Sequence, residues 1–129
     1  MMKKIGLVCL CLAATACSHD LGLMKMEDTL ASYGSAIRWG LFEKAADFQE
    51  PQNRTRLDLG YLKNIHVTSY DPVYRQEHKG SNFLRQTVEI RYYQEQTGVE
   101  KTITDRQSWR YDKERGEWLL MSKLPDFKP

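Results

Sequence analysis

Cysteine is scarce in this chain, and its placement is uneven. The chain has 129 residues and three cysteines, Cys9, Cys11 and Cys17, all near the N-terminus. Residues 18–129 therefore contain no internal disulfide, and a domain formed by them must be stabilised by packing. The same absence excludes a thiol nucleophile and a cysteine-built metal site in this region.

An excess of charge of one sign is also absent. The chain has 19 lysines and arginines against 17 aspartates and glutamates. Two of the basic residues, Lys3 and Lys4, belong to the N-terminal segment 1–16, and without them the two signs balance. Nucleic-acid-binding proteins and polybasic readers of lipid surfaces need a sustained basic excess. We therefore expect no nucleic-acid partner.

Motifs for catalysis and metal binding are missing as well. The sequence has no GxSxG, no HExxH and no glycine-rich phosphate loop, so the corresponding enzyme classes have no support. His66 and His78 have acidic neighbours but not the spacing that brings three or four ligands around one metal ion. We expect two surface histidines, no metal, no cofactor and no catalytic residue that a motif would identify.

The N-terminal segment MMKKIGLVCLCLAATAC is the most informative part of the sequence. Lys3 and Lys4 give it a positive start, residues 5–13 are uncharged and mostly apolar, and small residues precede Cys17. This pattern is typical of a secretory signal peptide, and the apolar stretch is too short for a membrane-spanning helix. We expect residues 1–16 to be removed as a signal peptide. An ordinary signal followed by a chance cysteine is the alternative.

The last four residues of this segment, ATAC, resemble the lipobox of bacterial lipoproteins. The resemblance implies lipid attachment at Cys17, with diacylation of its sulfur and acylation of the new amino terminus. Ala14 departs from the family pattern, in which leucine is commonest at that position. Each buried methylene contributes about 0.8 kcal/mol, so two or three acyl chains make a lasting membrane anchor. Ser18 after the cysteine resembles the signal for outer-membrane sorting and implies an outer-membrane lipoprotein facing the periplasm, with the inner membrane as the alternative.

The rest of the chain is long enough for one folded domain. We expect residues 17–22 to form a short tether, residues 23–125 a single domain, and residues 126–129 a tail beyond the fold. The tether would hold the domain close to the bilayer, because so few extended residues span only a short distance.

Apolar periodicity predicts helices in the first part of this domain. Six apolar residues are spaced by three and four, which marks one face of an α-helix: Leu23, Met26, Leu30, Tyr33, Ile37 and Leu41. Gly40 is expected to break this helix, and a second short helix should end before Pro51.

From residue 62 onward the period changes to two, which is typical of β-strands. We expect four strands, at 62–70, 83–95, 99–112 and 117–123, with turns between them. Pro72 should restrict the first strand to a sheet edge or a bulge. The sequence therefore predicts an α+β fold, in which N-terminal helices pack across a curved antiparallel sheet of about four strands. In its core, Leu30, Tyr33 and Ile37 should contact Val88, Ile90 and Trp109.

Two segments, YGSAIRWGLFEKAADF and QSWRYDKERGEWLLMSKLP, together with the long antiparallel strands, resemble the nuclear-transport-factor-two-like superfamily. The resemblance covers residues 23–125 and implies a cone-shaped domain, in which helices close a strongly curved sheet around a pocket. A cystatin-like helix on a sheet is the neighbouring resemblance. No catalytic residue of the superfamily can be matched to a position here.

The predicted inner face of the sheet contains unusual polar residues. If Val99, Ile103, Trp109 and Tyr111 point inward, strict alternation places Asp105 and Gln107 on the same side. Our candidate pocket-lining residues are therefore Tyr33, Asp105, Gln107 and Trp109. An inward Asp105 would be protonated or paired, for example with Arg38, because an unpaired buried charge is costly. A bulge that returns Asp105 to water is the interpretation that we favour.

Two functional hypotheses follow. The leading one is a non-catalytic periplasmic domain, held at the membrane by its N-terminal lipid, that binds an envelope protein or a small apolar ligand. Formation of a homodimer stays open. The alternative is a small pocket enzyme or ligand carrier, similar to the ketosteroid isomerases and dehydratases of the superfamily, with Asp105 as the base.

Overall fold

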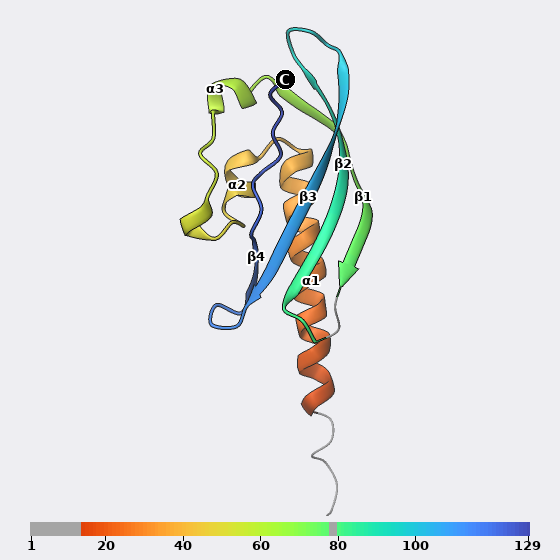
Figure 1. Cartoon of the computed structure of the whole chain (residues 1–129), viewed down its shortest axis with the longest axis vertical. Helices are drawn as coiled ribbons and strands as arrows, with labels where there is room; N and C mark the ends of the chain where they lie inside the picture. Colours follow the sequence, from red (N-terminus) through yellow and green to blue (C-terminus); the bar gives the residue numbers. More distant parts are fainter. Residues whose placement is uncertain (1–13, 78–79) are drawn as a thin grey trace, which may run out of the picture.

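The computed structural model describes the backbone of residues 14–77 and 80–129, with side chains from Lys25 onward (Figure 1). Its elements are α1 (Ala14–Arg38), α2 (Phe42–Ala46), the 3₁₀ turn η1 (Pro51–Asn53), α3 (Leu59–Leu62), β1 (Ile65–Glu77), β2 (Phe83–Gln94), β3 (Glu100–Asp112) and β4 (Glu117–Leu120). The strands form one antiparallel sheet in the order β1-β2-β3-β4. Figure 1 shows a curved, open sheet with the helices on one side. The predicted two-layer α+β fold is confirmed.

Helix α1 ends where its glycine predicts. Gly40 has a φ of 73°, a left-handed conformation that glycine adopts without steric cost. The N–H of Gly40 donates to the carbonyl of Ile37 at 3.1 Å, and that of Leu41 to Ala36 at 2.8 Å. This pair of bonds is the Schellman arrangement, which satisfies the last carbonyls of the helix. The predicted break at Gly40 is confirmed.

The start of α1 differs from the prediction. We expected residues 17–22 to form a tether before the domain, but α1 spans Ala14–Arg38 and includes them. The predicted signal peptide falls mainly on residues 1–13, and lipid attachment depends on the side chain of Cys17. Both lie outside the residues and side chains that the structure describes. Among the described residues, no helix combines the length and apolar character needed to span a membrane.

Strand β1 also begins later than the sequence indicated. The side chain of Asp58 accepts a hydrogen bond from the Tyr61 N–H at 3.2 Å and so caps the short helix α3, which replaces the start of the predicted strand. The strand then continues to Glu77 along one edge of the sheet. Its register against β2 shifts between Val67 and Ser69 and again between Pro72 and Tyr74. Pro72 therefore lies on an edge strand next to a bulge, as predicted.

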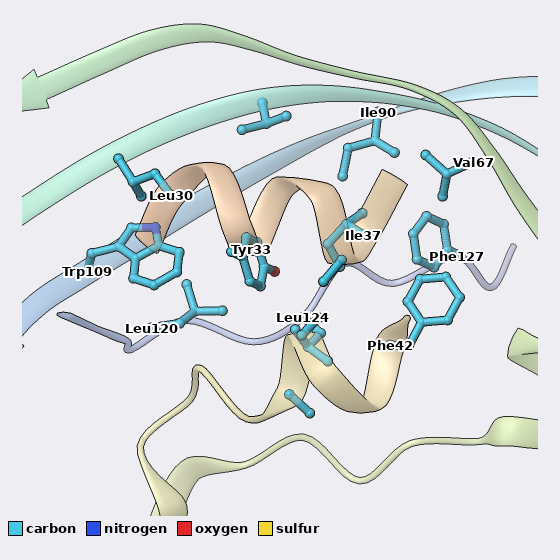
Figure 2. Close-up of a cluster of buried hydrophobic side chains, with 14 of the residues drawn as sticks. Leu30, Tyr33, Ile37, Phe42, Val67, Ile90, Trp109, Leu120, Leu124 and Phe127 are labelled. Atoms are coloured by element: carbon cyan, nitrogen blue, oxygen red, sulfur yellow. The ribbon is translucent and has the colours of Figure 1, made fainter. Parts of the chain in front are cut away.

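The core lies between α1 and the inner face of the sheet (Figure 2). Tyr33 and Ile37 of α1 and Trp109 of β3 are all 0% exposed, and the rings of Tyr33 and Trp109 meet edge to face at 5.2 Å. The predicted core residues Leu30, Tyr33, Ile37, Val88, Ile90 and Trp109 all belong to this cluster, so that prediction is confirmed.

The C-terminal segment belongs to the fold, contrary to our expectation of a tail after Pro125. Phe127 is only 3% exposed, and its ring lies 4.9 Å from Tyr92 and 5.5 Å from Phe42. Its carbonyl accepts a hydrogen bond from the Tyr61 hydroxyl at 3.0 Å. β4 is only four residues long, and the chain after it closes the open end of the core with an aromatic side chain.

Candidate functional site

A row of polar side chains crosses the inner face of the sheet. Arg75 of β1 lies opposite Gln86 of β2, which in turn lies opposite Gln107 of β3. Gln86 and Gln107 are each 2% exposed. Directly paired residues of neighbouring antiparallel strands share one face, so the three side chains form a row that runs from the exposed Arg75 into the interior. Asp105 and Trp109 flank Gln107 on the same face of β3.

Gln107 is the centre of a hydrogen-bond network. Its Nε2 donates to Asp105 Oδ2 at 2.8 Å and to the Tyr70 hydroxyl at 2.9 Å. Its Oε1 accepts from Trp109 Nε1 at 3.0 Å and from Gln86 Nε2 at 3.2 Å. An amide offers two donors and two acceptor sites, so every hydrogen-bonding position of Gln107 is used. The Trp109 indole can only donate, which determines the orientation of the amide.

The network continues to the surface. Gln86 Oε1 accepts from Arg75 Nε at 3.3 Å and Nη2 at 3.2 Å, and Arg75 Nη1 pairs with Glu27 of α1 at 2.5 Å. Each amide thus turns its carbonyl towards the cation at Arg75 and its NH₂ towards the carboxyl group of Asp105. The aligned amide dipoles stabilise the two opposite charges at the ends of the row.

Asp105 points into the protein, so the bulged interpretation that we favoured is wrong. Pairing between β2 and β3 runs without a register shift, and Asp105 is 7% exposed. Burial raises the pKa of its carboxyl group above the ordinary value of 3.8, and the bond from Gln107 partly offsets this rise. Among the described residues no cation forms a salt bridge with Asp105.

The pairing of Asp105 with Arg38 does not occur. Arg38 is at the C-terminal end of α1, where its Nη1 donates to the carbonyl of Val67 at 2.6 Å. Its guanidinium also lies 4.6 Å from the ring of Trp39. The bulge in β1 after Val67 leaves this carbonyl within reach of the helix end, which explains the different partner.

Two tyrosines lie near the network. Burial raises the pKa of Tyr70 to about 12, and the charge of Asp105 contributes to this rise. Burial also raises the pKa of Tyr33 well above its usual value, with Asp105 as the second cause. The Tyr33 hydroxyl has no hydrogen-bond partner among the described residues. Both phenols therefore stay neutral at physiological pH.

Two surface hollows approach this network. A groove of about 640 Å³ between α1 and β1 is lined by Tyr70, Arg75 and Gln86, and by Leu30, Ala31, Gly34, Ser35, Trp39 and Pro72 among others. A cavity of about 450 Å³ adjoins Asp105 on the other side, between residues 103–106 of β3 and the C-terminal residues 122–126. Of the four candidate pocket-lining residues, Asp105 lines this second cavity, while Tyr33, Gln107 and Trp109 line neither hollow.

Some of this arrangement was missed in the sequence. Gln86 is the one polar residue in the apolar alternation from Leu84 to Tyr92, and that interruption was a usable signal. Tyr70 was missed because the bulge after Val67 reverses the phase of β1. Val99 was placed on the inner face, but it precedes β3 and is 58% exposed.

His66 is exposed, as expected, and stacks on Tyr93. His78 lies outside the described residues.

Comparison of the chain with protein-family models, curated proteins and solved structures finds no match in any of the three.

Proposed function

We propose that this protein is a lipid-anchored lipoprotein of the bacterial outer membrane and that its domain is a non-catalytic binding module facing the periplasm. The anchor follows from the lipobox-like ATAC sequence before residue 18. The domain binds a segment of an envelope protein in the groove between α1 and β1. The alternative occupant of the same groove is a small apolar ligand, and the experiments below distinguish it from a protein segment.

The observation that carries the binding proposal is that the inner face of the sheet is filled while the groove is open. Tyr33, Ile37 and Trp109 occupy the interior, and the amide of Gln107 has no free hydrogen-bonding position. A ligand would have to displace these contacts to enter the interior. The groove instead offers about 640 Å³ that is accessible from outside.

The surface of the groove suits a peptide segment. Trp39, at one end, is 68% exposed, and exposed tryptophans are enriched at binding hot spots. Glu27, Ser35 and Asp71 also line the groove and are exposed. An apolar anchor next to exposed polar side chains provides both contact area and polar groups that orient a bound chain.

The anchor is tested by metabolic labelling with a clickable fatty acid. The wild-type chain should incorporate the label and sediment with outer membranes, because Cys17 is the only cysteine left after removal of residues 1–16. Cys17→Ser should incorporate none. Label that persists on the Cys17→Ser form would exclude a lipoprotein.

The groove is tested by photo-crosslinking in cells. A photoreactive amino acid at Ser35, which lines the groove, should capture a discrete protein partner. Ser32 provides a matched control, because it is an exposed serine on α1 outside the lining. Equal capture at both positions would reject the groove as the site. No capture at Ser35, together with a small molecule in native mass spectra of the purified protein, would favour the apolar ligand.

A second candidate, a small pocket enzyme of the ketosteroid isomerase type, is favoured by one observation. Asp105 is buried, has a raised pKa and adjoins a cavity of about 450 Å³. Such a carboxylate would remove a proton next to a ketone and return it elsewhere on the conjugated system. Conversion of a β,γ-unsaturated ketosteroid to the conjugated enone, followed by ultraviolet absorbance, should then require Asp105 and be lost in Asp105→Asn. Absence of turnover by the wild-type protein would remove this candidate.

A further inference from the structure

The backbone along the first half of β3 is unpaired with any described strand on the side away from β2. β4 pairs with β3 only from Trp109 to Asp112. After β4, the chain makes two more contacts with Ser108 and then leaves the strand. Among the described residues, no strand lies beside residues 100–106 on this side. The C-terminal segment diverges from β3 (Figure 1), and its residues 122–126 face residues 103–106 across the hollow of about 450 Å³.

The backbone groups that this edge presents follow from the bonds of Ser108. Its N–H donates to Ser122 Oγ at 3.1 Å, and its carbonyl accepts from the Met121 N–H at 2.7 Å, so both point away from β2. Strand geometry repeats every two residues, and pairing with β2 is regular throughout. Thr102, Thr104 and Arg106 therefore present their N–H and carbonyl groups at the open edge.

The side chains along the edge are complementary to themselves. Residues 100–106 read EKTITDR, with Ile103 at the centre. When two copies of this segment run antiparallel about Ile103, Glu100 lies opposite Arg106 and Lys101 opposite Asp105, with threonine opposite threonine between them. Every charged residue then faces the opposite charge. Opposite-charge pairs and threonine pairs at directly opposed positions stabilise antiparallel sheets.

The backbone pattern fits the same register. Thr102, Thr104 and Arg106 direct their backbone groups at the edge, so Thr102 and Thr104 of opposite copies form hydrogen-bonded pairs. Lys101 and Asp105 then fall at a non-hydrogen-bonded pair, where facing side chains are closest. Asp105 lines the cavity beside this edge and has no salt bridge among the described residues. Lys101 of the second copy supplies the missing cation.

We propose that two copies of this chain associate through the edges of β3, antiparallel about Ile103, and form one continuous sheet. The partner at this edge is a second copy because residues 100–106 are complementary in charge to the same seven residues of another copy. All of the charged residues find an opposite charge only in this register. Charged side chains on an edge strand can also serve to prevent association, and that is the opposing interpretation that the experiment decides. The proposal does not depend on the lipid anchor or on the groove.

The test is disulfide cross-linking of the full chain in cell lysates with copper phenanthroline. Ile103→Cys places two thiols opposite each other on the two-fold axis and should give a covalent dimer above the background of the wild-type chain. Thr102→Cys is the matched control, because its opposite residue is Thr104 and the two introduced thiols are offset. Dimer yields that do not differ between the two variants would overturn the proposal.

Charge reversal at the exposed residues Glu100 and Arg106 provides a second arm of the test. In the Ile103→Cys background, Glu100→Arg and Arg106→Glu each place like charges opposite each other twice per dimer, and each should reduce cross-linking about tenfold. Coexpression of the two variants with different tags should restore the mixed dimer, because every pair is then opposite in charge. Glu89→Arg, an exposed position on the neighbouring strand, should change nothing. Failure of the mixture to recover, or an equal loss in Glu89→Arg, would refute the pairing.

Discussion

Replacement of Gln107 by leucine tests the buried network most directly. Leucine has nearly the same volume but removes all four hydrogen bonds that the amide makes to Asp105, Tyr70, Gln86 and Trp109. A net contribution of about 1 kcal/mol for each bond gives a loss of about 4 kcal/mol, since buried partners are left without substitutes. Urea denaturation of wild type and variant measures this loss from the change in midpoint at constant slope.

Two further variants make the assay specific. Gln52→Leu changes the same residue type at an exposed position and should alter stability by less than about 0.5 kcal/mol. In the double variant of Gln86 and Gln107, both members of one bond become apolar, so the combined loss should be smaller than the sum of the single losses. A Gln107→Leu protein within about 1 kcal/mol of wild type would show that the amide does not organise the interior.

Asp105→Asn, measured at low protein concentration, should leave the melting temperature unchanged at pH 4 and raise it relative to wild type at pH 8. Because the pKa of Asp105 is raised in the folded protein, the stability that its protonated form contributes is present below pH 3.8 and is lost as the pH rises through the raised value. A variant that becomes less stable than wild type as the pH rises would instead indicate a paired carboxylate. Phe127→Ala should lower the free energy of unfolding, measured by urea denaturation, by about 3 to 5 kcal/mol. A loss near zero would show that residues 126–129 are a tail outside the fold. Gly34→Ala should destabilise by about 1 to 2 kcal/mol despite its gain in helix propensity, because the new Cβ would lie 2.7 Å from Tyr70 Cε1. Increased thermal stability would contradict that contact.

The fold was predictable because the spacing of apolar residues along the sequence indicates which side of each element is buried. The spacing of Leu30, Tyr33 and Ile37 identified the buried face of α1, and Gly40 identified its end. Alternation along β2 and β3 identified the inner face of the sheet, because these two strands pair without a register shift. In such regular elements, side-chain direction follows directly from position.

The candidate site was predictable only in part. Strict alternation placed Asp105 and Gln107 together, but our preference for a bulge put Asp105 in water. The bulges occur in β1 instead, where they bring Tyr70 inward, and sequence gives no rule for their position. Burial of Phe127 was missed because we took Pro125 as the end of the fold, whereas the chain stays packed beyond Leu120, where regular structure ends.

The irregular edge formed by β1 limits how far the sheet can grow. Its two register shifts and Pro72 interrupt the row of backbone donors and acceptors that another strand would need. If two copies join through β3, each outer margin of the combined sheet is a β1 edge of this kind. The two margins then cannot template further addition, so the assembly closes at a pair and does not polymerise into a fibril.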